Sequence, residues 1–249
     1  MKHFLITQWN IDMYDMNWLL ERQKLFEKYT LPSIEGQHNK DFEWLLISDA
    51  RTPDSFKNVM DRWPARTIYK DWSNYQWAEL PGIKVDSPMG LAVRIETIAD
   101  VVAEAIGQQD TDYVITSRLD NDDIIAKEHM SRIQGYASEL WETKGLKFWV
   151  TMTRGYRLCG DKIYPINSKC SSFVSFVEDP ENLQTCYACV HTMTERDAKS
   201  KGFPFVILRE GEPTWAEVIH PGTVMNRLKR YRGERPVTKE FLERFSIDG

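Results

Sequence analysis

The sequence has no long hydrophobic run, and none of its apolar segments approaches the roughly 20 residues of a membrane-spanning helix. Its first residues, Met1-Lys2-His3, lead directly into an apolar segment that predicts a strand, which is unlike a secretory signal peptide. We therefore expect a cytoplasmic protein without a transmembrane segment.

An excess of positive charge is also absent. The chain has 32 lysines and arginines against 37 aspartates and glutamates, which gives a formal net charge of −5. A protein that binds nucleic acid through a broad basic face needs the opposite balance, so we expect no nucleic-acid partner.

Cysteine is scarce, with Cys159, Cys170, Cys186 and Cys189 only. The spacing Cys186-x-x-Cys189 occurs in zinc and redox sites, but a site of four cysteines usually has two close pairs, and Cys159 and Cys170 are eleven apart. No strand and helix opening of the thioredoxin kind surrounds the motif. We expect free thiols in a reducing compartment.

The 249 residues are enough for one large α/β domain with a substantial core. Hydrophobic patterning predicts strands at 4–7, 42–49, 66–69, 113–115, 148–152 and 205–208, with a hairpin region at 155–177. It predicts helices at 18–31, 56–63, 91–106 and 133–140, a long loop at 71–89 and a short helix near 241–245.

One of these helices is predicted by Trp18, Arg22, Leu25 and Tyr29, which recur at spacings of four, three and four. We expect that helix to end near Leu31-Pro32, because proline interrupts helices.

Strands and helices alternate through the first 125 residues, and the second half is richer in short strands. This order predicts an α/β fold: a single domain with a mostly parallel central sheet and a mixed β extension. We expect this domain to span residues 1–226 and a basic C-terminal tail with a short helix to span 227–249.

The most informative motif is Thr116-Ser117-Arg118-Leu119-Asp120-Asn121-Asp122-Asp123, which follows the apolar strand Tyr113-Val114-Ile115. It places three carboxylates where a strand leaves the core, and hard divalent cations prefer oxygen ligands of this kind. Asp120 and Asp122 are two apart, so in an extended stretch both would point the same way and could reach one metal ion.

Polar residues follow two other strands in the same way. The segment from Thr7 to Asn10 ends the first strand, and Asp49 ends the second. Ligands of parallel α/β sheets sit beyond the carboxyl ends of the strands, so we expect these residues and the aspartate motif to share one edge.

This order of elements resembles the nucleotide-sugar-dependent glycosyltransferases of the GT-A fold. The string from Thr116 to Asp123, with Trp44-Leu45-Leu46-Ile47-Ser48-Asp49 upstream and Val218-Ile219-His220 downstream, resembles the rhamnosyltransferase family in particular. The resemblance covers most of residues 3–226.

The resemblance implies a Mn²⁺ or Mg²⁺ cofactor that bridges the aspartate motif and the diphosphate of the donor. It gives Asp122 direct contact with the metal and gives Asp120 the ribose, or the metal through water. It adds His220 as a late metal or diphosphate ligand, against the alternative of a structural histidine. Asp123 is either a third carboxylate of the site or the cap of a following helix.

On the nucleotide side, the resemblance gives Thr7 and Asp49 the nucleobase and ribose, although Asp49 could instead cap the next helix. Arg94 and Arg118 are expected to pair with the diphosphate or to orient the aspartates, because a guanidinium matches both groups. For Arg94 the alternative is a solvated helix face.

The general base that an inverting transfer needs is harder to identify. Glu217 is our expectation, although strand alternation places it on the opposite face from His220. Asp179, Glu181 and Glu195 are further candidates that the sequence does not rank.

The expected function is metal-dependent transfer of a sugar, rhamnose by the family's name, from a UDP-, dTDP- or GDP-linked donor to a glycan or other hydroxyl acceptor. One alternative is a nucleotide- or carbohydrate-binding protein of the same fold without turnover. Another is a nucleotidyltransferase, which would usually have a glycine-rich phosphate loop that we do not find near the first strand.

Overall fold

The computed structural model describes residues 1–72, 98–145, 147–169, 171–221 and 233–248. Its strands are β1 (Lys2–Gln8), β2 (Glu43–Asp49), β3 (Arg66–Lys70), β4 (Val114–Arg118), β5 (Ile124–Ile125), β6 (Phe148–Met152), β7 (Arg154–Cys159), β8 (Lys162–Asn167), β9 (Val174–Glu178), β10 (Phe205–Leu208), β11 (Trp215–Val218) and β12 (Arg235–Pro236). Its helical segments are α1 (Met16–Leu25), the π-helical η1 (Phe26–Thr30), α2 (Leu31–Glu35), α3 (Asp54–Met60), α5 (His129–Lys144), the 3₁₀ turn η3 (His191–Met193), α6 (Thr194–Lys201), α7 (Lys239–Phe245) and residues 98–106.

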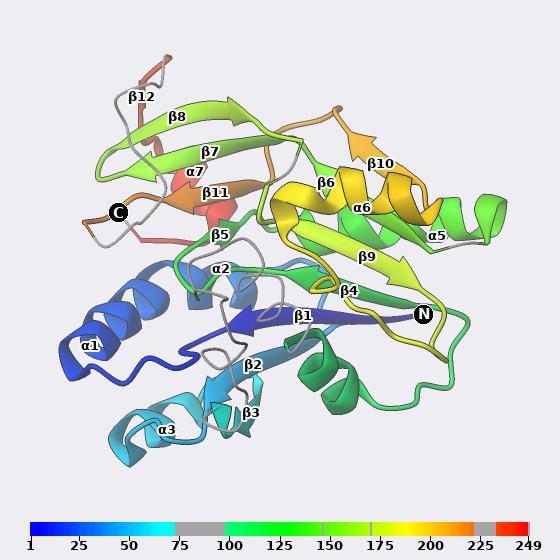
Figure 1. The fold of residues 1–249 in the computed structure, drawn as a ribbon. Coiled ribbons are helices and arrows are strands. Elements are labelled where there is room, and N and C mark those ends of the chain that lie inside the picture. The colour runs from blue at the N-terminus through cyan, green and yellow to red at the C-terminus, as the bar shows by residue number, and fades with distance from the viewer. Residues whose placement is uncertain (73–97, 146, 170, 222–232, 249) are drawn as a thin grey trace, which may run out of the picture.

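The larger sheet has the strand order β10-β6-β9-β4-β1-β2-β3 (Figure 1). Strands β4, β1, β2 and β3 are parallel to one another, as are β10 and β6, whereas β9 runs antiparallel to both of its neighbours. The carboxyl ends of the parallel strands therefore meet at one edge, which confirms the predicted mostly parallel central sheet.

A second sheet has the order β12-β8-β7-β11-β5. Strands β7 and β11 are parallel, and the other pairs are antiparallel, including the predicted β7–β8 hairpin. This second sheet is the expected mixed β extension.

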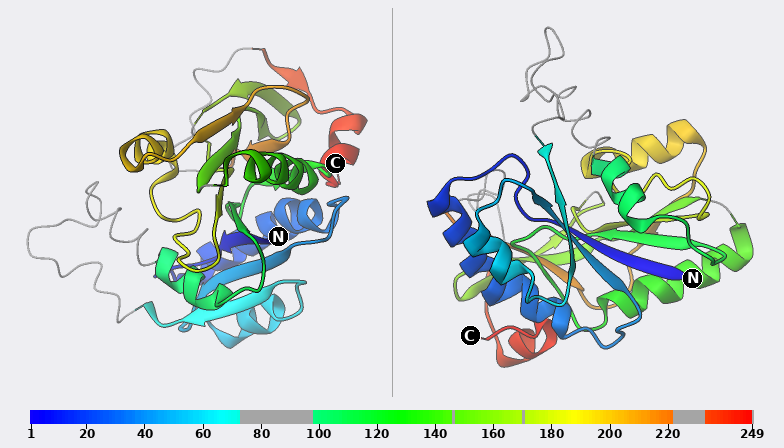
Figure 2. Two further views of the ribbon diagram at one scale, coloured as in Figure 1. Left: turned by 90° about the vertical axis from the view of Figure 1, so that its right-hand side faces the viewer. Right: turned by 90° about the horizontal axis from the view of Figure 1, so that it is seen from below.

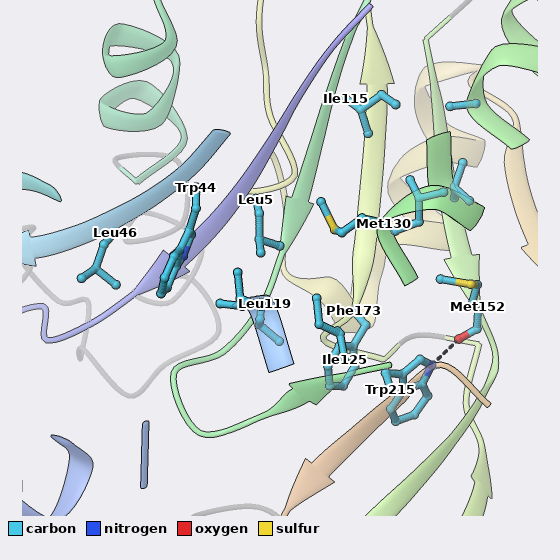
Figure 3. Close-up of a cluster of buried hydrophobic side chains, with 14 of the residues drawn as sticks. Leu5, Trp44, Leu46, Ile115, Leu119, Ile125, Met130, Met152, Phe173 and Trp215 are labelled. Carbon is cyan, nitrogen blue, oxygen red and sulfur yellow. Dashed lines mark hydrogen bonds between the residues drawn. The ribbon is translucent and has the colours of Figure 1, made fainter. Parts of the chain in front are cut away.

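The central sheet is buried on both faces. Along β1, Leu5 belongs to one core and Phe4 and Ile6 to the other, because successive residues of a strand point to opposite faces. The first core includes Trp44 and Met130 of α5 (Figure 3), and the second includes side chains from residues 98–106 and from α6. Burial on both faces explains why the strands read as continuous apolar runs.

The helical segment after β1 is longer than the sequence predicts. The π-helical turn η1 joins α1 to α2, and the amide of Leu31 donates to the carbonyl of Phe26. Pro32 lies in the first turn of α2, where a missing N–H breaks no hydrogen bond. The segment therefore continues to Glu35, and the predicted end near Leu31-Pro32 is wrong.

The end of the chain packs on the second sheet. Phe241 and Phe245 of α7, the short helix expected here, join a third core with Ile124 and Val218. In Figure 2 α7 lies beside the segment that contains α2. The end of α7 is also bonded to the chain after β5, where the amide of Lys127 donates to the carbonyl of Arg244.

Several predictions fall partly outside the described residues. They are the start of the helix at 91–106, most of the loop at 71–89, the domain boundary at 226, the first part of the basic tail, and Cys170. Cys159 and Cys186 are free thiols. In the part of the chain that the structure describes, no helix has the length and apolar character of a membrane span.

Strand β7 approaches β11 so closely that a side chain at position 155 has no room. A Cβ added to Gly155 would lie 2.4 Å from ring atoms of Trp215. Trp215 is fully buried, and its indole Nε1 donates to the carbonyl of Met152 at 2.6 Å (Figure 3).

We predict that Gly155→Ala lowers the free energy of unfolding by roughly 1–3 kcal/mol, because overpacking forces buried side chains out of place. Gly135→Ala is the matched control, since Gly135 is exposed in α5 and has no atom within 4 Å of an added Cβ. Alanine favours helices by about 1 kcal/mol over glycine, so the control should be neutral or stabilising. Urea unfolding followed by circular dichroism compares the two, and wild-type stability of Gly155→Ala would contradict the close approach.

Candidate active site

The aspartate motif begins where β4 ends. Arg118, the last residue of β4, donates through Nε to Oδ1 of Asp120 at 3.0 Å, and its guanidinium lies 5.3 Å from the ring centre of Tyr187. Burial opposes the charge on Arg118, but the carboxylate of Asp120 and the neighbouring Tyr187 and Cys186 together outweigh it and raise the pKa of the guanidinium. Arg118 is therefore held against Asp120, and its expected role at the donor site stays a prediction.

Asp122 lies between two groups from distant parts of the chain. Its Oδ2 is 2.5 Å from Nη1 of Arg22 in α1 and 2.9 Å from Nε2 of His220, which follows β11. We call these three residues the Asp122 cluster. Burial opposes ionisation of Asp122, but the hydrogen bond from His220 and the charge of Arg22 together hold its pKa below the usual range. Asp122 is therefore a stable carboxylate.

The sequence suggested that both aspartates point toward one metal ion from an extended stretch. In the structure they do not point at a common centre. Residues 121 and 122 form a turn, and the amide of Asp123 donates to the carbonyl of Asp120 at 3.2 Å. Asp120 faces Arg118 while Asp122 faces α1 and His220.

Asp123 connects the two sheets. Its Oδ1 accepts from the amide of Val218 at 3.1 Å, and its Oδ2 accepts from Oγ of Ser172 at 3.4 Å. Burial, together with the nearby charges of Asp122, Asp120 and Glu217, raises the pKa of Asp123 well above the usual range. Strand β5 follows it directly, so the alternative of a helix cap is wrong.

Asp49 is fully buried at the end of β2. Its oxygens accept from the amide and guanidinium of Arg51, from the amide of Asp12 and from the hydroxyl of Tyr14. The guanidinium of Arg51 lies 4.3 Å from the ring centre of Tyr14. Asp49 therefore holds the loop after β1 in place and does not cap α3, and its predicted contact with the donor stays a prediction.

Thr7 is fully buried near the end of β1, where its hydroxyl accepts from the indole N–H of Trp44 at 3.1 Å. Its predicted role in donor binding also stays a prediction. Arg94 lies outside the described residues.

Glu217 in β11 is paired with Arg157 of β7, with 2.6 Å between Oε2 and Nε. This residue pair sits in register between the two parallel strands. Glu217 is thus close to the motif, as its effect on Asp123 indicates, but its carboxylate already has a cationic partner.

Asp122 and His220 are the residues that would hold a divalent cation. A carboxylate oxygen and an imidazole nitrogen 2.9 Å apart are donors of the kind that Mn²⁺ accepts, so the pair fits the expected cofactor. Among the described residues, however, no three His, Cys, Asp or Glu side chains gather as a metal-binding group. The remaining ligands would have to come from the donor's phosphates or from water.

Sequence reasoning missed Arg22, Arg157 and the Tyr14–Arg51 pair. A signal for Arg22 was present, because it interrupts an otherwise aromatic and apolar stripe that contains Trp18 and Leu25. Arg157 gave no comparable signal, since its pairing with Glu217 depends on the register of β7 and β11.

The loop after β9 holds Tyr187 against Arg118. It is anchored by Glu178, whose fully buried carboxyl accepts from the amides of Gln184 and Thr185 at 2.8 Å each. Burial raises the pKa of Glu178 from 4.5 to about 7.

From this pKa we predict a loss of stability between pH 4.5 and pH 7. In that window the folded protein keeps a proton on Glu178 that the unfolded chain has released, so the stabilisation falls as the pH rises. Glu178→Gln should therefore gain stability relative to wild type with rising pH, by at most about 3 kcal/mol at 1.4 kcal/mol per pKa unit. Melting temperatures from pH 4.5 to 8 measure it. The exposed Glu181→Gln in the same loop is the control, and parallel pH curves for all three proteins would contradict the prediction.

Comparison with known proteins supports the fold. No curated protein matches the sequence. Among solved structures, TarS 1-349 of S. aureus is 13% identical with a TM-score of 0.46, and the match covers 88% of this chain and 60% of that fragment. Mouse xyloside xylosyltransferase 1 is 10% identical with a TM-score of 0.50, and the match covers 87% of this chain and 97% of that one. The likeness to the xylosyltransferase structure confirms a GT-A-like fold, and this chain spans about 60% of the TarS fragment's length.

Comparison with protein families identifies the family of this chain. Residues 6–201 match the family described as "Putative rhamnosyl transferase". This range includes the carboxyl ends of β1 and β2 and the aspartate motif. The chain belongs to this rhamnosyl transferase family.

Proposed function

We propose that the protein transfers a sugar, rhamnose by the family's name, from a nucleoside-diphosphate donor to a hydroxyl group of a glycan or other acceptor. The observation that carries the proposal is the Asp122 cluster, in which a half-buried aspartate with a lowered pKa meets His220 and Arg22 beyond the carboxyl end of β4. That edge of a parallel α/β sheet is where ligands bind.

In this reaction the bond between the sugar's anomeric carbon and the donor's phosphate oxygen breaks. A bond forms between the same carbon and the acceptor oxygen, and the acceptor's hydroxyl proton leaves. The nucleoside diphosphate departs with an added negative charge, so positive groups near its phosphates lower the barrier. A Mn²⁺ or Mg²⁺ ion held by Asp122 and His220 would supply part of that charge.

The chain's own residues supply the rest. Arg22 and Arg118 present guanidinium groups on both sides of the motif, and a guanidinium pairs well with phosphate oxygens. Because an ionised Asp122 can only accept, Nε2 of His220 carries the hydrogen in the observed pair. To bind a cation through Nε2, His220 would have to carry its hydrogen on Nδ1 instead.

The acceptor's proton needs a base if the reaction inverts the anomeric centre. We assign this role to Glu217 as the carboxylate beside the motif, where it is paired with Arg157. Thr7 and Asp49 then support the nucleoside side through β1, β2 and the loop that Asp49 fixes.

We predict that Asp122→Asn removes the dependence of nucleotide binding on Mn²⁺ and weakens binding of the matching nucleoside diphosphate at least about tenfold, or 1.4 kcal/mol. Calorimetric titration with UDP, dTDP and GDP, with and without Mn²⁺, measures both effects. Asp110→Asn is the matched control, because Asp110 is exposed in the loop before β4, at the opposite edge of the sheet.

Two outcomes would count against the proposal. Equal Mn²⁺-dependent affinity in wild type and Asp122→Asn would remove Asp122 from the metal site. Tight binding of a nucleotide sugar without release of nucleoside diphosphate, in the presence of rhamnosyl and other glycan acceptors, would favour a binding protein without turnover.

A further inference from the structure

A cavity of about 350 Å³ adjoins the Asp122 cluster. Its wall includes Asn17, Trp18, Glu21 and Arg22 from α1, with His220 and Pro221 from the chain after β11. Arg22 and His220 are the same two residues that contact Asp122, so the cavity opens directly beside the proposed reaction centre. Its volume lies at the lower end of the range of small-molecule sites, roughly 300–1,000 Å³.

Two other cavities lie farther from this centre in the fold. One is lined by Phe42 and Trp44 near the amino end of β2, and the other by Asp112 and Tyr113 just before β4. Both are therefore at the amino edge of the parallel strands, where ligands of such sheets are not usually bound.

The chemistry of the cavity wall suits a sugar. Trp18 offers an aromatic ring on which the C–H face of a pyranose can pack. Asp15 caps α1 by accepting from the backbone amide of Trp18 at 2.8 Å, which stabilises the helical turn that carries this ring. Asn17 and Glu21 are exposed amide and carboxylate groups that can bond to sugar hydroxyls.

The helix geometry keeps these groups together. Asn17, Trp18, Glu21 and Arg22 follow one another at spacings of one, three and one, so they share one side of α1. The guanidinium of Arg22 lies 5.0 Å from the ring centre of Trp18, which connects the aromatic ring to the Asp122 cluster.

We propose that this cavity binds a pyranose ring, with Trp18 as the stacking platform and Asn17 and Glu21 as hydroxyl partners. The inference rests on the proposed function for the identity of the sugar. The ring is either the sugar of the nucleotide donor or the terminal sugar of the acceptor, and these two sources share the same chemistry.

The test measures sugar binding separately from nucleotide binding and turnover. Saturation-transfer NMR with p-nitrophenyl α-L-rhamnoside and with other p-nitrophenyl pyranosides, at saturating nucleoside diphosphate, reports an acceptor-like sugar. The ratio of affinities for a nucleotide sugar and its nucleoside diphosphate, by calorimetry, reports a donor sugar.

We expect Trp18→Leu to lower either pyranoside binding or the ratio of nucleotide-sugar to nucleoside-diphosphate affinity roughly 3- to 10-fold. This is the effect of losing one aromatic contact. Trp18→Phe should recover most of the loss, and affinity for the nucleoside diphosphate alone should not change. Leu20→Ala is the matched control, because Leu20 is 47% exposed on the same helix and does not line the cavity. Loss in the nucleotide-sugar ratio assigns the cavity to the donor, and loss of pyranoside binding assigns it to the acceptor.

The cavity proposal would be overturned if Trp18→Leu, folded by its melting temperature, changed neither quantity, or if Leu20→Ala had the same effect as Trp18→Leu. The proposed function can fail independently. If Asp122→Asn leaves nucleotide binding intact while Trp18→Leu abolishes pyranoside binding, the sugar site stands and the metal assignment does not.

Discussion

The active-site geometry depends on one buried contact, the acceptance of the Val218 amide by Asp123. Asp123 lies between β4 of the central sheet and β5 of the second sheet, and Val218 ends β11, which pairs with β5, so this contact ties the motif to the second sheet. His220 lies two residues beyond Val218, and it reaches Asp122 only because the two strands are held at this distance. Gly155 serves the same end, since it lets β7 pack against Trp215 at the start of β11.

The distribution of charge explains why Asp123 is the aspartate of the motif whose pKa is raised. Three carboxylates each have an arginine from a different element: Asp120 with Arg118, Asp122 with Arg22, and Glu217 with Arg157. Asp123 accepts from an amide and a hydroxyl instead, while burial and the surrounding negative charges disfavour its ionisation. Pairing three carboxyl groups with arginines and raising the pKa of the fourth limits the repulsion within the site before any substrate binds.

The sequence was sufficient for what depends on neighbouring residues. Runs of apolar residues identified the parallel strands, because a sheet buried on both faces leaves no alternation to confuse with a helix. The position of Asp120 and Asp122 after a strand was visible for the same reason. His220 lies 98 residues from Asp122, and only resemblance to a family suggested it. The internal partners of Asp49 and the pairing of Arg157 depend on strand register and loop closure, which no local pattern encodes.

The helix α1 shows how a correct pattern can be incomplete. Trp18, Arg22 and Leu25 have helical spacing, and so do the buried Leu19 and Phe26. Leu19 and Phe26 are buried on the core side of the helix. The residues of the first stripe line the cavity beside the Asp122 cluster. An ordinary amphipathic helix has one buried face and one solvated face, so periodicity distinguishes them. A helix that lies between a core and a ligand cavity has apolar residues on both of its faces. Only the tertiary structure shows which of the two faces contacts the ligand.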